Sequence, residues 1–130
     1  NAGLFSTARD VARVYQMLLN GGEIDGQRYL SKETCQLFTT EISKISRRGL
    51  GFDKPDADDP KKGNCAPAAP AEVYGHTGFT GTCAWVDPMN ELVYVFLSNR
   101  IYPDVTNRKL NQLHIRERIQ GAIYDAMKKK

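Results

Sequence analysis

The chain has 130 residues, of which 41% are hydrophobic and 25% charged, and its formal net charge at pH 7 is +3. This length suits one domain with a modest core, and the composition excludes a chain that is disordered throughout. The charge is too small to indicate a nucleic-acid partner, and part of it lies in lysines 128–130, which we interpret as a solvated helix end. No apolar run approaches the roughly 20 residues of a membrane-spanning helix.

The first four residues carry neither a start methionine nor a signal-peptide pattern, so we expect the chain to begin inside a longer protein or after processing. The cysteine count is odd, and Cys35, Cys65 and Cys83 are widely spaced. This spacing indicates neither a metal site nor a disulfide framework. We therefore expect buried or loop thiols, no metal and no cofactor.

Two helices are predicted in the first third of the chain. Residues 8–19 have an apolar stripe at i, i+3, i+4 and i+7, with Ser6 or Thr7 as the cap and Asp10 placed as in a capping box. Gly21 and the following glycine end this helix. Residues 23–28 predict a turn, and Ser31 caps a shorter helix that reaches about residue 38.

Residues 49–52 are a candidate short strand, and residues 54–71 have no periodicity, which predicts a long surface loop. Strands are predicted at residues 73–76 and 82–86. A turn at residues 87–90 then leads to the run 92–97, which is almost continuously apolar and is therefore predicted to be buried on both faces. These last two strands form an antiparallel hairpin.

The chain is predicted to end in a helix over residues 115–127. Residues 106–114 belong to a separate turn or short helix. The apolar face of the last helix comprises Ile115, Ile119, Ala122, Ile123, Ala126 and Met127. Together the elements predict an α+β fold, in which helices flank an antiparallel sheet within one unit of residues 1–130.

Two stretches resemble a known family. One begins Ala2-Gly3-Leu4-Phe5-Ser6-Thr7-Ala8-Arg9-Asp10, and the other is Gly75-His76-Thr77-Gly78-Phe79-Thr80-Gly81-Thr82, followed by Trp85-Val86-Asp87-Pro88 and Phe96-Leu97-Ser98-Asn99-Arg100. They are similar to the C-terminal half of the β-lactamase-related serine hydrolases, which include class C β-lactamases, D-alanyl-D-alanine carboxypeptidases and serine esterases. The resemblance implies the C-terminal part of a β-lactamase/transpeptidase-like fold.

Such enzymes combine Ser-x-x-Lys, a Ser or Tyr motif that ends in Asn, and Lys-Thr-Gly on a strand. Only the third motif has a counterpart here, as His76-Thr77-Gly78, because the chain contains no Ser-x-x-Lys, Tyr-x-Asn or Ser-x-Asn. The resemblance therefore implies that the nucleophile lies upstream, and we expect the isolated chain to be inactive.

The resemblance also implies roles for four consecutive residues. His76 would lie beside the hydrogen-bond network of the nucleophile, and Thr77 would offer its hydroxyl to the substrate. Gly78 would let the substrate approach the backbone, and the backbone N–H of Phe79 would donate to the oxyanion. The alternative for this segment is a glycine-rich turn without function.

Histidine replaces the lysine of the family motif at position 76. Lysine is a cation at pH 7, whereas histidine is usually mostly neutral, so it attracts a substrate carboxylate less. We therefore expect ester or peptide substrates over β-lactams. Two alternatives remain: a β-lactamase proper, and a degenerate, non-catalytic module of the same fold that binds or packs against another domain.

Further expectations concern partners, location and structural residues. We expect self-association through an exposed packing face and, by resemblance alone, a bacterial periplasmic or other extracytoplasmic location. Arg100 follows the buried strand and could reach the cleft, but we expect it to form a surface salt bridge instead. His114 is expected to lie at the surface or at a helix start. Core positions are expected for Tyr15, Trp85 and Phe96.

Overall fold

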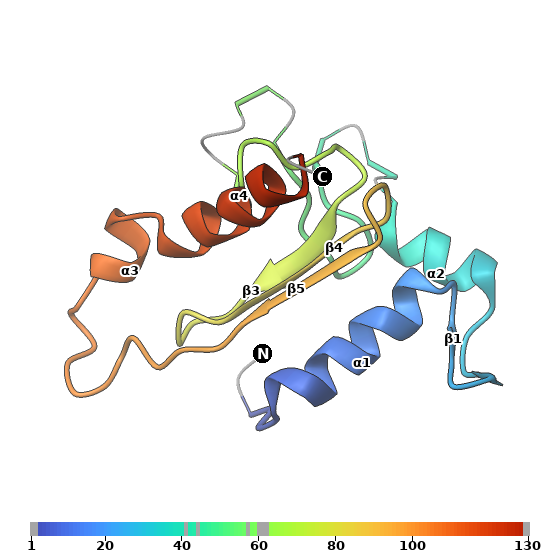
Figure 1. Cartoon of the computed structure of the whole chain (residues 1–130), viewed down its shortest axis with the longest axis horizontal. Coiled ribbons are helices and arrows are strands. Elements are labelled where there is room, and N and C mark those ends of the chain that lie inside the picture. The colour runs from blue at the N-terminus through green and yellow to red at the C-terminus, as the bar shows by residue number, and fades with distance from the viewer. Residues whose placement is uncertain (1–2, 41, 44, 57, 60–62, 129–130) are drawn as a thin grey trace.

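The computed structural model of the chain describes residues 3–40, 42–43, 45–56, 58–59 and 63–128. Its fold is α+β, as predicted (Figure 1). A three-stranded antiparallel sheet with the order β3-β4-β5 lies between helices, and β1 and β2 form a separate two-stranded hairpin.

Helix α1 (Ala8–Leu19) begins where the sequence predicts a capping box. The Thr7 hydroxyl oxygen accepts a hydrogen bond from the backbone N–H of Asp10 at 3.1 Å, and the same hydroxyl lies 2.8 Å from the Asp10 carboxylate. The cap is Thr7 and not Ser6. The helix ends at the two predicted glycines, since Gly21 and Gly22 both have positive φ.

The predicted turn at residues 23–28 is the tip of a hairpin formed by β1 (Glu23–Ile24) and β2 (Gln27–Arg28). Asp25 and Gly26 turn the chain with φ values of 52° and 75°. Helix α2 (Lys32–Thr39) follows, and the Ser31 hydroxyl caps it by accepting from the Thr34 N–H at 3.1 Å. The second predicted helix is thus confirmed with its cap.

The main sheet consists of β3 (Tyr74–Thr77), β4 (Cys83–Asp87) and β5 (Leu92–Phe96). All five residues of β4 are buried, because a strand lies on either side of it. In β5 only Tyr94 is buried. The prediction that residues 92–97 are buried on both faces is therefore wrong: in the described part of the chain, β5 is an edge strand and β4 is the central one.

Helices α1 and α4 (Ile115–Met127) cover opposite faces of this sheet (Figure 1). On one face the Tyr94 hydroxyl donates to the backbone carbonyl of Arg116 in α4 at 3.2 Å. On the other face Tyr74 packs edge-on against Phe52, which packs in turn against Tyr15 of α1. Short helix α3 (Lys109–Gln112) precedes α4, and His114 between them is exposed at the helix start, as predicted.

Helix α4 does not bury the apolar stripe that its sequence predicts. Its buried residues are Arg116, Gln120 and Tyr124, while Ile119 and Met127 are each 38% exposed. Two of these buried side chains have clear partners: the Gln120 side-chain oxygen accepts from the Ala66 N–H at 2.8 Å, and the Tyr124 hydroxyl donates to Asp87 Oδ2 at 2.8 Å. The helix is rotated because these hydrogen bonds turn the polar row inward.

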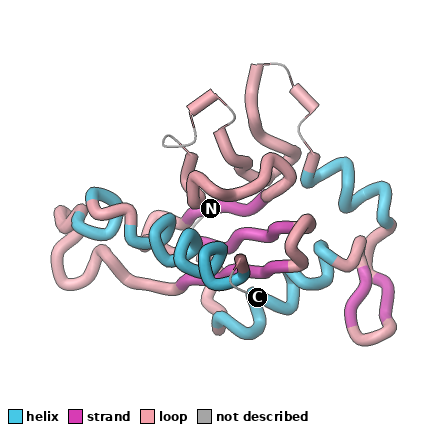
Figure 2. Tube along the Cα trace, turned by 45° about the horizontal axis from the view of Figure 1, so that its top comes forward, coloured by secondary structure: helices cyan, strands magenta, loops and turns pink. Residues whose placement is uncertain are grey.

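The loop predicted at residues 54–71 is not wholly a surface loop. Cys65 and Ala66 are each 2% exposed, and Cys65 belongs to the core beside Trp85. No strand forms at residues 49–52; the next residue, Asp53, pairs with Gly75 at the β3 edge through backbone hydrogen bonds of 2.7 and 3.0 Å. Figure 2 shows these loops gathered along that edge of the sheet.

Among the described helices, none is both long and apolar enough to cross a membrane.

Candidate functional site

Strand β3 places His76 and Thr77 on opposite faces of the sheet. His76 is paired with Ala84 on the α1 side and is exposed, whereas Thr77 is paired with Cys83 on the α4 side and is half-buried. This follows because successive side chains of a strand alternate. The two side chains therefore contact different regions on either side of the strand.

The imidazole ring of His76 has a defined orientation. Its Nδ1 lies 2.7 Å from the backbone carbonyl oxygen of Thr77. A carbonyl oxygen can only accept a hydrogen bond, so Nδ1 carries the proton in this contact. In a neutral ring, Nε2 is then left as an acceptor that can take a proton from a neighbouring group.

The turn at residues 78–82 connects β3 to β4 and is closed by its own backbone. The Gly78 N–H donates to the Thr82 carbonyl at 2.8 Å, and the Gly81 N–H donates to the Gly78 carbonyl at 3.0 Å. A Cβ added at Gly78 would lie 2.3 Å from the Thr82 hydroxyl oxygen. A side chain at this position would thus displace the Thr82 hydroxyl, independently of any substrate.

Phe79 projects from this turn with 68% of its surface exposed. Among the residues that the structure describes, none accepts a hydrogen bond from its backbone N–H. The guanidinium carbon of Arg100 lies 4.9 Å from the centroid of the Phe79 ring, which is cation–π geometry. Among the described residues, no carboxylate forms an ion pair with Arg100, so its surface salt bridge stays a prediction.

The segment after β5 contributes Ser98, for which we predicted no role, and Arg100, for which a position at the cleft was the less favoured alternative. The Ser98 hydroxyl donates to the Thr80 carbonyl at 3.1 Å, and the Arg100 N–H donates to the same oxygen at 2.9 Å. The register contains the signal for this contact: Cys83 pairs with Phe96, so residues after 96 must run beside residues before 83. The structure thus brings together residues 76–80 with Ser98 and Arg100.

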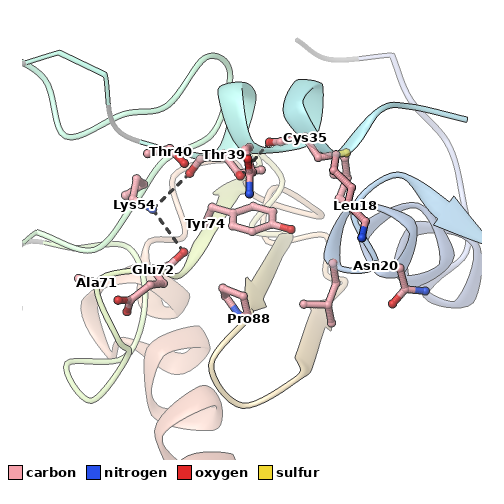
Figure 3. Close-up of a pocket in the computed structure, with 14 residues that line it drawn as sticks. Leu18, Asn20, Cys35, Thr39, Thr40, Lys54, Ala71, Glu72, Tyr74 and Pro88 are labelled. Carbon is pink, nitrogen blue, oxygen red and sulfur yellow. Dashed lines mark hydrogen bonds between the residues drawn. The ribbon is translucent and has the colours of Figure 1, made fainter.

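A cavity of about 720 Å³ lies at the other end of β3, away from His76 (Figure 3). It is lined by the end of α1, by α2 and by residues of the neighbouring loops, with Tyr74 at its wall. Within it the Lys54 ammonium donates to the backbone carbonyls of Thr39 and Glu72, both at 3.3 Å. None of residues 76–79 lines this cavity, so it is separate from the candidate site.

The three cysteines are buried and free, as predicted. Burial raises the pKa of Cys65 to about 12 and that of Cys83 to about 11, and burial also raises the pKa of Cys35. Thiols with such pKa values stay protonated near neutral pH and are poor nucleophiles. Among the described residues, no cluster of His, Cys, Asp and Glu is suited to hold a metal ion.

Comparisons with known proteins agree with the motif. The family model described as Beta-lactamase matches residues 1–117. Proteins from Escherichia coli O157:H7 and E. coli K12, each named "Putative D-alanyl-D-alanine carboxypeptidase", are 35% and 34% identical over 111 residues, or 85% of this chain. A protein of the same name from Salmonella agona is 34% identical over the same length.

The chain spans about a quarter of the length of these relatives: 25% of the two E. coli proteins and 26% of the Salmonella protein. The match to the family model nevertheless covers most of the chain, including the strand His76–Gly78 and its turn. The chain belongs to the β-lactamase family of serine hydrolases.

Proposed function

We propose that this chain is the C-terminal part of a serine hydrolase that cleaves esters or amides through an acyl-enzyme. The observation that carries the proposal is the turn after β3: it follows His76-Thr77-Gly78, the counterpart of the family's Lys-Thr-Gly motif, and holds a Phe79 N–H for which no described residue is an acceptor. An N–H of this kind is the donor that an oxyanion requires.

In the proposed reaction a serine Oγ from another part of the full-length protein attacks the substrate carbonyl carbon. The carbonyl oxygen becomes an oxyanion, to which the Phe79 N–H donates. Such a donor is typically worth about 3 kcal/mol in the transition state. Nε2 of His76 is available to the nucleophile's hydrogen-bond network, because Nδ1 is engaged with the Thr77 carbonyl.

Thr77 and Gly78 form the substrate-binding part of this strand in our proposal. The Thr77 hydroxyl would bind a polar group of the substrate, and Gly78 would keep the backbone accessible. No residue of this mechanism requires a metal or a cofactor. Asp53, which pairs with Gly75, and the buried residues Cys65 and Ala66 would support β3.

For the substrate, we propose a peptide or ester and not a β-lactam. The names of the E. coli relatives refer to D-alanyl-D-alanine carboxypeptidase, which favours a peptide. Histidine at position 76 also lacks the permanent charge of the family's lysine. The test is to compare a D-Ala-D-Ala peptide, nitrophenyl esters and nitrocefin with the full-length protein; nitrocefin hydrolysis as fast as the best ester would contradict the proposal.

Labelling with a fluorophosphonate or a labelled penicillin tests whether the chain acts alone. We expect no covalent adduct on the 130-residue chain by intact mass, since it contains no Ser-x-x-Lys. An adduct on native chain that is absent from heat-denatured chain would show that the chain has its own nucleophile.

A second candidate function is a non-catalytic module of the same fold that binds a peptide or a glycan. Of the three family motifs, these 130 residues contain a counterpart of the third alone. The amino-acid sequence upstream of this chain distinguishes the two functions. Ser-x-x-Lys and Tyr-x-Asn there would support the enzyme, and their loss would support the module.

The proposed partner of the chain is the N-terminal part of the same domain. Two exposed features support this: β5 is an edge strand of apolar sequence, and the α4 stripe that includes Ile119 and Met127 is partly exposed. Without that partner we expect self-association, as dimers or larger species in sedimentation velocity. A chain that stays monomeric at about 100 μM, a concentration at which weak association is populated, would contradict this. We also propose an extracytoplasmic location.

A further inference from the structure

The turn that carries Phe79 is held from outside by residues 98–100. Three contacts join this segment to two consecutive residues of the turn: the Ser98 hydroxyl and the Arg100 N–H both donate to the Thr80 carbonyl, and the Arg100 guanidinium lies over the Phe79 ring. The segment therefore contacts both the backbone and the side chain of the turn.

The fit between the two segments is tight at Gly81. This residue has φ of +93°, and a Cβ there would lie 2.6 Å from the Ser98 hydroxyl oxygen and 3.3 Å from Cγ of Arg100. The backbone of the turn thus approaches residues 98–100 as closely as a chain without a side chain allows. The turn cannot shift toward this segment without displacing it.

Both the side chain and the backbone N–H of Phe79 have few restraints. Its ring is 68% exposed, and its N–H has no described acceptor, so no backbone hydrogen bond from this residue fixes the peptide plane. A planar guanidinium covers an aromatic face more completely than an ammonium does. The stacking of Arg100 is therefore a contact that can restrain the largely exposed Phe79 side chain.

We propose that Arg100 is a positioning residue: by stacking its guanidinium on the Phe79 ring, next to the backbone hydrogen bond from residue 100 to the Thr80 carbonyl, it fixes the direction of the Phe79 N–H. This rests on the proposed function, in which that N–H is the oxyanion donor. A donor lowers the barrier only when it is already oriented toward the developing charge. Arg100 would thus act on the reaction through Phe79, without contacting the substrate.

The first test is a double-mutant cycle in the full-length protein, with Arg100→Lys, Arg100→Ala, Phe79→Leu and the double variant Arg100→Ala/Phe79→Leu. We expect kcat to fall about tenfold in each single variant, because the donor is retained but no longer oriented. KM should change little, and the double variant should be no worse than either single one. Arg118→Ala, at an exposed position of α4, is the matched control and should keep full activity.

Arg100→Lys separates positioning from charge. Lysine keeps the positive charge but not the planar stack. If Arg100→Lys keeps full kcat while Arg100→Ala does not, or if KM rises only for anionic substrates, then Arg100 acts as a charge toward the substrate and the proposal is overturned. Additive effects of Arg100→Ala and Phe79→Leu would also overturn it, because Arg100 would then not act through Phe79.

The second test needs no catalysis and uses the 130-residue chain. We expect the amide resonance of Phe79 to shift and its ¹⁵N relaxation to show increased motion in Arg100→Lys, and to stay unchanged in Arg118→Ala. An unaffected Phe79 amide overturns the positioning role even if the enzyme is active. If the amide responds but kcat does not, the N–H is not the donor, and the oxyanion role in the proposed function fails instead.

Discussion

At the scale of single residues, the turn after β3 depends on the position of its glycines, which have no side chain. Gly81 combines a left-handed φ with a neighbour closer than any Cβ tolerates. Gly26 in the β1–β2 hairpin also has positive φ, of +75°, but a Cβ there would meet nothing within 4 Å. A comparison of Gly81 with Gly26 therefore separates the cost of backbone strain from the cost of a steric clash.

We expect Gly81→Ala to destabilise the chain by about 3 kcal/mol and Gly26→Ala by about 1 kcal/mol. Both variants have the strain of positive φ, but only the first forces the Ser98 segment away. Urea unfolding, followed by the fluorescence of the single tryptophan, Trp85, measures both. Equal losses would show that the segment moves aside freely.

At the scale of elements, α4 is attached to the sheet by polar contacts as well as apolar ones. Asp87 at the end of β4 is 1% exposed and accepts from the Tyr124 hydroxyl and from the N–H groups of Met89 and Asn90. The carboxylate thus joins the β4–β5 turn to the last helix. The apolar stripe of α4 is left partly outside as a consequence.

Tyr124→Phe should lower the free energy of unfolding by about 2 kcal/mol, since it removes a buried hydrogen bond to a charged group and leaves the ring in place. Tyr102→Phe is the control, because Tyr102 is 77% exposed and should lose nothing. Thermal unfolding by circular dichroism compares them. A Tyr124→Phe variant as stable as the control would mean that Asp87 is satisfied by its own turn alone.

The loops at the β3 edge are also attached to the sheet by polar contacts. The Asp53 carboxylate is 1% exposed and lies 3.0 Å from an Arg47 guanidinium nitrogen and 2.9 Å from the Asn64 amide. Its backbone pairs with Gly75, next to His76. A buried charge with several partners therefore anchors the loops to the strand that carries the family motif.

At the scale of the whole molecule, the core contains cysteine thiols and tyrosine hydroxyls whose burial disfavours loss of their protons. Burial raises the pKa of Cys65 to about 12 and of Cys83 to about 11, from a value of 9.0 for an unperturbed thiol. Burial also raises the pKa of Tyr74, Tyr94 and Tyr124. In each case the folded chain holds its proton at a pH where the unfolded chain has lost it.

This linkage predicts alkaline destabilisation. Below pH 9 both states keep the thiol protons and these groups do not change stability; above pH 9 the unfolded state loses protons first, so stability falls as pH rises toward the folded pKa values. We expect a decrease of roughly 1 kcal/mol per pH unit for each buried thiol.

Urea midpoints at pH 7, 8.5 and 10 measure this dependence. The first two should agree, and the third should be lower. Cys83→Ala should lower stability at pH 7 by its lost packing but flatten the decrease above pH 9. A midpoint that rises between pH 8.5 and 10 would contradict the predicted sign.

Local signals in the sequence were enough for much of this architecture. Capping side chains at Thr7 and Ser31 and the glycines after α1 set helix ends through hydrogen bonds within a few residues. The strand-forming residues at 82–86, the apolar run at 92–97 and the turn residues between them predicted the hairpin. The His76-Thr77-Gly78 motif, with its flanking stretches, led to the family.

Contacts between distant segments could not be predicted in this way. The buried side of α4 follows from hydrogen bonds of Gln120 and Tyr124 to residues 54 and 37 positions away, not from its apolar periodicity. The same holds for Cys65 in the core and for Arg100 over Phe79. By itself, the sequence determined the elements and the family, because both are encoded in neighbouring residues. Only the tertiary structure decided which faces are buried and what holds the Phe79 turn, because these depend on partners that the chain brings together when it folds.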